Sequence, residues 1–533
     1  TGVNRYEQVG FAPMWGNSFL YLFGWQNGAE FLSEDGTRCL MSNPQNAAAL
    51  EWMKKTYDAI GGYLNVRGFE GAGGFGRTVD PFITGRVAMI INGNWVLDDI
   101  VRYKPDLDFG VALPPAPKGG EALTWSGGFA LAIPAASKHA EDAWELAKWL
   151  AFEEGMMYQS LRQKEFNKTI QKDYFIPRLS CQRSLNENLF KAFPAPNQNL
   201  QNVINTFLQM LDRSRFRPVT PAGQTLWNEQ LLATYLALAG DLSPQEALSQ
   251  AARRVQDELN RLYIPPDYPP LRWDWVIAIG ALILAVLIGI WAAAIIKFCR
   301  TTRLYRKEAA FGILFIAPWL LGFLIFIFGP MFVSLVFSFC EYDVIHPAKF
   351  AGISNYVELF GFHKVPTVDG GMVWAPRDPY FWKCVWNTFY LAAVGVPLGM
   401  ILGLAIAMLL NAEVKGISFY RTFFYLPSIV PAVATAVLWF WLLNPQIGGV
   451  NYVIRPVLEL MRLGAPQWFD SPVWSKPGLL LMLMWGAGGS MIIWLAGLKG
   501  ISRQYYEAAE IDGAGPVKRF FYVTLPMLSP YIF

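Results

Sequence analysis

The sequence predicts a multi-domain protein in which a soluble α/β part precedes an all-α part that crosses a membrane several times. Charged residues are spread through residues 1–270, whereas long stretches without any charge follow from Trp275 onward. Of the 533 residues, 53% are hydrophobic and only 16% are charged, against about 25% charged in soluble domains. This composition excludes a disordered chain, and a net charge of +3 indicates no strongly charged partner such as nucleic acid.

Five charge-free stretches are long enough to cross a bilayer, because a spanning helix needs about 20 apolar residues. These stretches are 275–296, 309–340, 384–412, 422–446 and 478–498. A sixth hydrophobic stretch opens at Val523 and reaches the last residue, and the sequence has neither an initial Met nor a signal peptide. We therefore expect a fragment that is truncated at both ends.

Positive charge predicts how the spans are oriented. The link between the first two spans, residues 297–310, holds five cations: Lys297, Arg300, Arg303, Arg306 and Lys307. Such a concentration in a short loop is typical of the cytoplasmic side. The first span then runs from outside to inside, so residues 1–270 are expected on the extracytoplasmic side. The same rule puts residues 444–477 outside and residues 499–520 inside.

The soluble part has the pattern of an α/β domain, which we assign to residues 1–263. Apolar residues recur at helical spacing over 44–60 and 141–153, and three short apolar runs between them indicate buried strands. These runs are 87–91, 109–113 and 129–133. Residues 243–262 begin with Ser-Pro and have Glu246 where a capping box needs it, which predicts a terminal helix. Residues 264–274 follow as a linker, in which IPPDYPP indicates a stiff spacer.

Nucleotide and metal sites receive little support. The segment GAGGFGRT at 71–78 has the glycine spacing of a phosphate-binding loop, but no apolar strand precedes it and no helical pattern follows. We therefore expect a flexible loop there. The five Cys form no CxxC, and no two of the three His are adjacent. We expect this chain to bind neither a cofactor nor a metal.

Two tryptophans beside Gly and Asn are candidates for ligand contact. Trp95 lies in INGNW, after the first predicted strand, and Trp125 lies in TWSGGF, before another. An indole with amide donors nearby suits the apolar face and the hydroxyl edge of a sugar ring. Trp52, Trp144 and Trp149 instead fit the buried faces of predicted helices.

Over residues 10–263 the chain resembles the family 1 extracellular solute-binding proteins of bacterial sugar importers. The resemblance rests on GAEFLSEDGTRCLMSNPQNAAALEWMKKTYDA, FITGRVAMIINGNWVLDDI and WSGGFALAIPAASKHAEDAWELAKWLA. It implies a periplasmic-binding-protein-like fold of type II, whose two lobes close on a sugar or oligosaccharide, and it implies that the opening part of the domain is missing. It also implies sugar contacts, stronger for the first four and weaker for the last two, at Trp95, Trp125, Gly127, Gly128, Trp15 and Trp25.

The later part resembles the maltose/glycerol-phosphate type of permease subunit. Residues 505–530, YYEAAEIDGAGPVKRFFYVTLPMLSP, match the EAA motif of ABC importer permeases at every spacing. The resemblance implies a type I ABC importer permease domain at 311–533 that lacks its last helices, with 275–296 as an extra transmembrane helix. It also implies a loop that couples to a cytoplasmic ATPase dimer through Glu507, Ala508, Ala509, Asp512 and Gly513. ATP and Mg²⁺ then belong to that ATPase, and a second permease subunit, expected to be a different protein, completes the pore in the lipid bilayer.

The implied function is carbohydrate uptake across the bacterial cytoplasmic membrane by alternating access, so the chain is a transport subunit and not an enzyme. A membrane-tethered sugar receptor without transport is the main alternative, but it needs neither five spans nor an EAA loop. A secondary transporter needs ionisable residues within the membrane, which the charge-free stretches lack. An enzyme using Asp98 and Asp99 is disfavoured because neighbours in sequence rarely face one another across a substrate.

The residues that line a transport path are poorly marked. Gly486, Gly488, Gly489 and Ser490 are small residues within the last complete span. Small residues in membrane helices favour close helix packing, which we predict here over ligand contact.

Overall fold

The computed structural model describes residues 6–71, 80–128, 130–169, 175–264, 267–299, 303–344, 346–366, 371–412, 415–445, 447–461 and 465–531. The chain forms two compact units. The first unit comprises Thr1–Pro265 together with Pro397–Phe533, and the second comprises Pro266–Val396.

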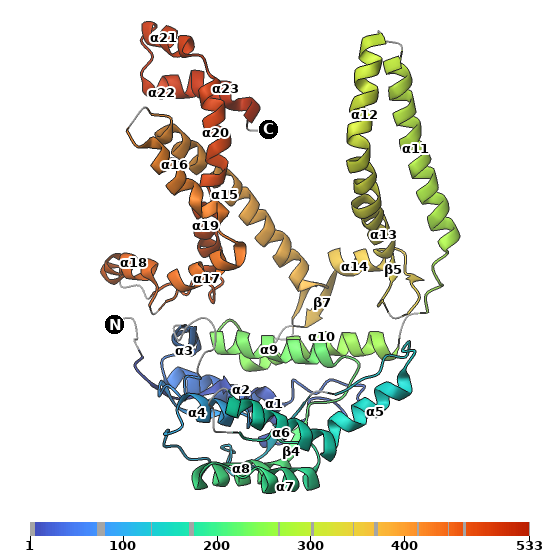
Figure 1. The fold of residues 1–533 in the computed structure, drawn as a ribbon, viewed down its shortest axis with the longest axis vertical. Helices are drawn as coiled ribbons and strands as arrows, with labels where there is room; N and C mark the ends of the chain where they lie inside the picture. Colours follow the sequence, from blue (N-terminus) through green and yellow to red (C-terminus); the bar gives the residue numbers. More distant parts are fainter. Residues whose placement is uncertain are drawn as a thin grey trace. The chain divides into compact units, whose positions relative to one another are not determined.

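The first unit opens with a two-stranded parallel sheet and the helices that connect its strands (Figure 1). The elements are β1 (Val9–Gly16), α1 (Leu20–Gln26), α2 (Pro44–Ala59), α3 (Tyr63–Gly71) and β2 (Val87–Ile91). Parallel neighbours need a long crossover, and the three helices lie within it. Asn43 caps α2 by accepting a hydrogen bond from the backbone N–H of Asn46, and Pro44 opens the helix.

A second group of elements follows in the soluble part of this unit. It consists of α4 (Val96–Tyr103), β3 (Thr124–Ser126), α5 (Ala140–Ala151), α6 (Glu153–Thr169), α7 (Arg183–Ala192), α8 (Gln198–Leu211) and β4 (Ser214–Phe216). Strands β3 and β4 pair in parallel, with Trp125 opposite Arg215. Helix α4 directly follows the β2 strand. Leu97 and Ile100 of α4 share an apolar core with Val203 of α8, and this packing holds α4 in place.

Two long helices close the soluble part: α9 (Gly223–Ala239) and α10 (Pro244–Tyr263). They pack against each other and against α2, and all three contribute to one large apolar core. Leu50, Leu226 and Leu259 are among its fully buried side chains. The predicted capping box is confirmed, because Ser243 accepts from the backbone N–H of Glu246 and the Glu246 carboxylate accepts from that of Ser243.

Several expectations for the soluble part are wrong. Residues 109–113 form no strand, and neither do 130–133, while Phe129 lies outside the described residues. A strand needs a partner: Thr124–Ser126 has one in β4, whereas the carbonyl of Phe109 accepts a hydrogen bond from a side chain instead. Trp144 and Trp52 were expected on buried helix faces, but both are exposed. Trp144 is 52% exposed and lies on α5, a helix without any buried residue. Within the segment GAGGFGRT, residues 72–78 lie outside the described residues.

The second unit holds the first apolar helices and a group of short strands. Its elements are α11 (Trp273–Cys299), α12 (Arg303–Phe323), the π-helix η1 (Leu324–Phe328), α13 (Gly329–Phe337), β5 (Cys340–Glu341), β6 (Lys349–Phe350), α14 (Ser354–Phe360), β7 (Phe362–Pro366), β8 (Met372–Pro376) and the first half of α15 (Pro379–Leu410). β5 pairs with β6 and β7 pairs with β8, both antiparallel. The π-turns of η1 end two residues before Pro330, whose missing N–H interrupts the α-helical ladder.

The linker before α11 is part of this strand group. Phe350 N donates to Pro269 O at 2.7 Å, and Leu271 N donates to Ala348 O at 2.9 Å. Pro270 thereby pairs with Lys349 as an isolated antiparallel bridge. The linker is therefore held against the β6 strand, beyond the stiffness expected from its prolines.

The rest of the first unit is helical. It comprises the second half of α15, α16 (Ile417–Tyr425), η2 (Leu426–Ile429), α17 (Ala432–Leu442), α18 (Gly449–Leu460), α19 (Ser475–Trp485), α20 (Gly488–Gly500), α21 (Arg503–Ile511), α22 (Pro516–Arg519), η3 (Phe520–Thr524), α23 (Leu525–Leu528) and η4 (Ser529–Tyr531). Ala407 of α15 and Met491 of α20 are buried in one core. A Cβ at Gly488 would lie 1.7 Å from the carbonyl oxygen of Phe424, which fits the predicted packing role of this glycine.

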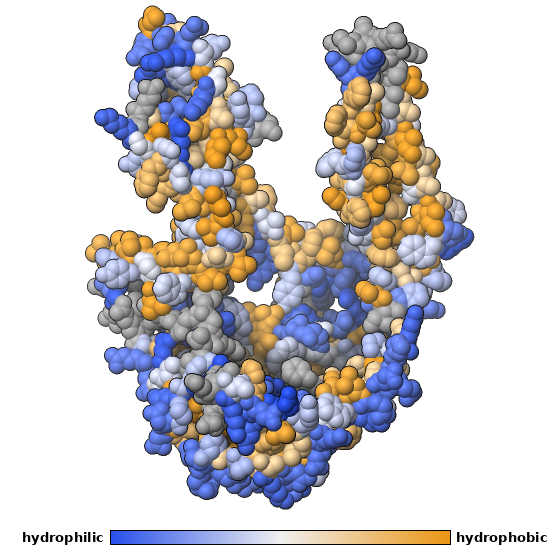
Figure 2. Space-filling model, viewed as in Figure 1, coloured by the Kyte–Doolittle hydropathy of each residue, from blue (hydrophilic) through white to orange (hydrophobic). Residues whose placement is uncertain are grey.

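Within the described residues, three helices are long and apolar enough to cross a membrane: Trp273–Ala294, Ala310–Phe337 and Tyr380–Leu410. Figure 2 shows apolar side chains over the surfaces of α11 and α12. The remaining two predicted spans are bent pairs of helices. Ile417–Ile429 and Ala432–Leu442 meet at 98°, at a break that contains Pro431, and Ser475–Trp485 and Gly488–Gly500 meet at 49°. The sequence pattern of five spans is matched if each bent pair counts as one.

Candidate ligand-binding and coupling sites

The strand ends of the first sheet bring together residues that are far apart in sequence. At the end of β1, Gly16 has φ +91°, and a Cβ there would lie 2.3 Å from the carbonyl oxygen of Ile91. This close approach needs glycine. It allows the N–H of Asn17 to donate to Ile91 O at 2.8 Å. The indole N–H of Trp125 then donates to Asn17 O at 2.9 Å, so Trp125 is fixed at the end of the β1–β2 pair.

Trp125 belongs to a half-buried aromatic platform, which we define as Phe19, Trp125 and Trp227. The Phe19 ring lies 4.8 Å from that of Trp227 and 6.1 Å from that of Trp125, both edge to face. The guanidinium of Arg217 lies over both indoles, 4.6 Å from the Trp227 ring centroid and 5.7 Å from that of Trp125. Flat aromatic surfaces beside polar groups are suited to sugar rings.

Sequence reasoning found Trp125 but missed Trp227 and Arg217. Trp227 lies in the helical run TLWNEQLL, where an aromatic residue is typical of a core face. Arg217 directly follows β4 in a segment with several other arginines. The pairing of β3 with β4 brings the two regions together, and a single sequence contains no signal for that pairing.

The other predicted sugar contacts have different surroundings. Trp95 is 52% exposed, and its ring lies over Gly93, where a Cβ would come within 2.1 Å of it. Gly127 has the same relation to Trp125, at 2.8 Å, while Gly128 is open. Gly93 and Gly127 therefore each leave room for the indole beside them, that of Trp95 and that of Trp125.

Trp15 and Trp25, the weaker candidates, are 6% and 4% exposed and lie in the core, where Trp15 contacts Phe69 and Trp25 contacts Tyr21. Buried rings of this kind offer little surface to a ligand in this conformation. They remain predictions of the resemblance, with packing as their observed role.

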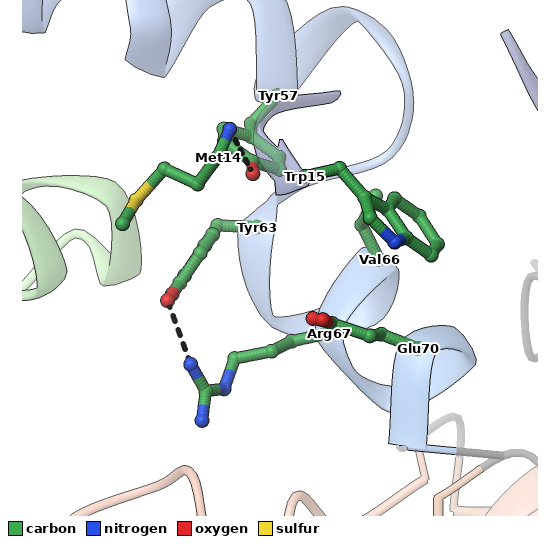
Figure 3. Close-up of a pocket in the computed structure, with 7 residues that line it drawn as sticks. All are labelled: Met14, Trp15, Tyr57, Tyr63, Val66, Arg67 and Glu70. Atoms are coloured by element: carbon green, nitrogen blue, oxygen red, sulfur yellow. Dashed lines mark hydrogen bonds between the residues drawn. The ribbon is translucent and has the colours of Figure 1, made fainter. Parts of the chain in front are cut away.

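A cavity of about 110 Å³ lies between β1 and α3 (Figure 3). Met14, Trp15, Tyr57, Tyr63, Val66, Arg67 and Glu70 line it. Tyr57 OH accepts from Met14 N, and burial raises the pKa of the Tyr63 hydroxyl above its ordinary value. Ligand pockets usually measure about 300–1,000 Å³, so this cavity is too small for an oligosaccharide.

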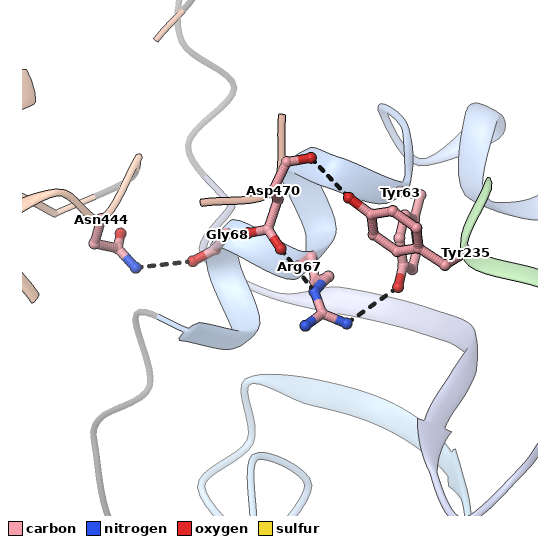
Figure 4. Close-up of polar contacts among 6 residues, drawn as sticks. All are labelled: Tyr63, Arg67, Gly68, Tyr235, Asn444 and Asp470. Atoms are coloured by element: carbon pink, nitrogen blue, oxygen red, sulfur yellow. Dashed lines mark hydrogen bonds and ion pairs between the residues drawn. The ribbon is translucent and has the colours of Figure 1, made fainter. Parts of the chain in front are cut away.

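Arg67 lines this cavity and also contacts the segment between the two bent helix pairs, within the first unit (Figure 4). Its Nη1 donates to Tyr63 OH and its Nε lies 3.2 Å from Asp470 Oδ1. Tyr235 OH donates to the backbone carbonyl of Asp470 at 2.9 Å. Asn444 adds a further bond, from its Nδ2 to Gly68 O at 3.4 Å. Asn444 and Asp470 are thus hydrogen-bonded to two helices of the soluble part, α3 and α9.

The predicted coupling residues lie on and just after α21. Gly513 has φ +75°, and the N–H of Ala514 donates to Ala509 O, so a left-handed glycine ends the helix. Ser502 stands at the N-cap position without a side-chain cap bond. Glu507 lies 3.7 Å from Arg503, an exposed pair of small energetic value.

One side of α21 presents small and apolar side chains to solvent. Ala508 is exposed and Ile511 is 88% exposed. Asp512 is exposed at the end of the helix. Tyr506 OH lies 3.0 Å from Thr524 Oγ1, which ties the opposite side of the helix to η3. A helix that is fixed on one side and apolar on the other is suited to receive another protein.

The arrangement defines a class: an integral membrane transport component with an attached ligand-binding region. Comparisons with known proteins agree. The family model of bacterial extracellular solute-binding proteins matches residues 4–164, and that of binding-protein-dependent transport system inner membrane components matches residues 395–533.

Individual relatives match the membrane part. The probable ABC transporter permease protein YesP of Bacillus subtilis is 38% identical over 236 residues, which are 44% of this chain and 70% of that protein. The lactose transport system permease protein LacF of Rhizobium radiobacter is 32% identical over 42% of this chain and 68% of its own length. The sulfoquinovosyl glycerol transport system permease protein SmoG of Agrobacterium fabrum is 33% identical over 35% of this chain and 54% of its own length.

Solved structures show lower similarity. A bacterial ABC transporter that imports the acidic polysaccharide alginate has 25% identity and a TM-score of 0.32 over 43% of this chain and 73% of that chain. The protein CpMnBP1 with mannobiose bound has 22% identity and a TM-score of 0.35 over 47% and 58%.

The chain belongs to the family of binding-protein-dependent ABC transporter permeases, and its N-terminal part is related to bacterial extracellular solute-binding proteins. It is accordingly a multi-pass inner-membrane transport component and not an enzyme.

Proposed function

We propose that this chain takes up a carbohydrate across the bacterial cytoplasmic membrane, as the fused binding and permease subunit of an ABC importer. One observation carries the proposal: a solute-binding match and a permease match occur in one chain, with the spanning-length helix α11 between them. The names of relatives that transport lactose, trehalose and maltose support a sugar as the substrate.

The proposed orientation has the soluble part outside and the EAA loop inside. The positive charges of residues 297–310 support it. The contacts of Arg67 and Tyr235 with Asp470 also support it, because the charge rule independently expects both the soluble part and residues 444–477 outside. Fusion of the two parts raises the effective concentration of the receptor at its own permease.

The energy would come from a separate cytoplasmic ATPase dimer that packs on α21. Glu507, Ala508, Ala509, Asp512 and Gly513 would form the contact, and the exposure of Ala508 and Ile511 supports it. ATP-driven closure of the dimer would move α21, and with a second permease subunit the membrane part would alternate between outward and inward access. ATP and Mg²⁺ would be held by the ATPase.

The test compares two glycines of the same loop. The chain would be reconstituted in nanodiscs with the ABC ATPase and second permease subunit of its host, and ATP hydrolysis measured with and without lactose, maltose or trehalose. Gly513→Ala should reduce sugar-stimulated hydrolysis, because φ +75° strains any side chain by about 1–2 kcal/mol and shifts the helix end. Gly515→Ala is the matched control, because Gly515 has φ −65° and open space around it.

Three outcomes decide between the functions. Stimulation that survives in Gly515→Ala and falls in Gly513→Ala supports a coupled importer. Sugar binding without any change in hydrolysis, in a complex shown to assemble, would reject coupling and favour a membrane-tethered receptor. Equal loss in both variants would reject the specific role of Gly513.

A further inference from the structure

Two arginines of the β4 region differ in how their charges are balanced. Arg215, within β4, has its Nη1 2.8 Å from the Glu30 carboxylate. Arg217, two residues later, is exposed and forms no ion pair with an acid among the described residues. The charge of Arg217 affects the Tyr21 hydroxyl: burial raises the pKa of Tyr21, and the positive charge of Arg217 opposes that rise. The aromatic platform therefore carries a cation without a counter-charge in the described part of the chain.

The two indoles constrain this cation. The guanidinium is planar and lies against both Trp227 and Trp125, and stacking on aromatic rings is a geometry that arginine favours. The side chain of Arg217 forms no hydrogen bond among the described residues, so its five N–H donors are available to a ligand. A carboxylate matches two of these donors at once, whereas a sugar hydroxyl offers a single neutral oxygen.

The same platform can hold the ring of a sugar. Trp125 is fixed by its hydrogen bond to Asn17, and Trp227 is fixed by its contacts with Phe19 and Tyr21. Both indoles are half buried, so each keeps some surface exposed beside the guanidinium. A ring with an attached carboxylate would therefore meet an apolar surface and a cation together.

We infer that the ligand of the aromatic platform is an acidic saccharide, a uronic acid or uronate oligosaccharide, whose carboxylate pairs with Arg217 while its ring contacts Trp125 or Trp227. This inference rests on the proposed function, because it names the substrate class of the same site. Arg217 is then the residue that selects acidic over neutral sugars.

The experiment uses matched sugar pairs that differ only in having a carboxylate in place of the hydroxymethyl group on each ring. Binding of digalacturonate and galactobiose, dimannuronate and mannobiose, and the corresponding gluco pair would be measured by calorimetry on the full chain in nanodiscs. We expect at least one acidic member to bind roughly tenfold to a hundredfold more tightly than its neutral partner, the range for hydrogen bonds to a charged group. Raising the salt from about 0.05 to about 0.5 M should weaken binding of the acidic member only.

Two substitutions assign the effect. Arg217→Gln should weaken binding of the acidic sugar much more than binding of the neutral one and so remove the preference, while Arg217→Lys should keep part of the preference because it retains the charge but not the planar fork. Arg215→Gln is the matched control, because its charge is already paired with Glu30, and it should keep the preference. Unchanged unfolding midpoints for all three would show that the fold is intact.

The outcomes separate this inference from the proposed function. Neutral sugars that bind as tightly as the acidic ones, or an equal loss for both in Arg217→Gln, would overturn the acidic preference and leave sugar import standing. Failure of every sugar to bind the folded chain would overturn both.

Discussion

The soluble region and the first two membrane helices contain the same kinds of apolar side chain but place them in opposite ways. Leu20 and Leu50 of the soluble region are fully buried, whereas Phe315 of α12 is 84% exposed. None of the most apolar window of α11 or α12 is buried within the protein. Exposed apolar surface is unfavourable in water but not against lipid tails. The comparison shows that the soluble core supplies its own apolar environment, whereas these helices obtain theirs from the bilayer or from other subunits.

The largest expected effect tests this difference with one substitution in each region. Leu50→Ala should lower the free energy of unfolding by about 2–5 kcal/mol, because it leaves a cavity in the core. Leu321→Ala, at an exposed position of α12, should cost less than about 1 kcal/mol. Denaturant unfolding of the chain in nanodiscs would measure both, and equal losses would break the comparison.

The next effect concerns close packing within the membrane part of the first unit. Gly488→Ala should destabilise the protein by about 1–3 kcal/mol, because the new Cβ would overlap the backbone of Phe424. Gly322→Ala is the control, since no atom lies within 4 Å of the position its Cβ would occupy. Thermal unfolding in nanodiscs gives the two values. A harmless Gly488→Ala would mean that this glycine is not a packing residue.

A smaller effect is expected at a helix start that faces water. Ser243→Ala removes the side-chain half of the capping box and should cost about 1 kcal/mol. Ser243→Asp keeps an acceptor and should cost less. The midpoint of urea unfolding is the measurement, and identical values for the two variants would show that the cap contributes nothing to stability.

The smallest effect is chemical and compares a partly buried thiol with an exposed one in the soluble region. Burial raises the pKa of Cys39 from 9.0 to about 11, whereas Cys181 is exposed. At pH 8 a maleimide should therefore label Cys181 faster, which peptide mass spectrometry would measure. Because the unfolded thiol ionises first, the stability due to a neutral Cys39 is complete below pH 9 and is lost as the pH rises through about 11. Equal labelling rates in the native chain would contradict the burial of Cys39.

Features that depend on local sequence could be predicted well. The apolar helices follow from the length of the charge-free stretches, because the bilayer sets that length. The Ser243 capping box, the Pro44 helix start and the left-handed Gly513 each involve residues within a few positions of one another. Short-range hydrogen bonds and backbone sterics determine such features, so they can be inferred from one sequence.

Features that depend on pairing between distant segments could not be predicted. Residues 109–113 are as apolar as a strand, yet the strand forms at Thr124–Ser126, because its partner β4 lies about 90 residues further along the chain. The same pairing brings Arg217 to Trp125. The break at Pro431 was visible as a proline within a span, but its 98° angle depends on how the two helices pack.

The pairing of the linker with β6 has a mechanical consequence. Helix α10 ends at Tyr263 and Pro269 is the first residue paired with the β6 strand, so only residues 264–268 separate the helix from this pairing. At about 3.3–3.6 Å per residue this connection spans at most about 20 Å, whereas a connection without the pairing, reaching to the start of α11, would span about 35 Å. A force applied to the solute-binding region would first act on the backbone hydrogen bonds of Pro269 and Leu271 with the β6 strand. The force would reach α11 only after these bonds had broken, so the β5–β6 hairpin protects the first membrane helix.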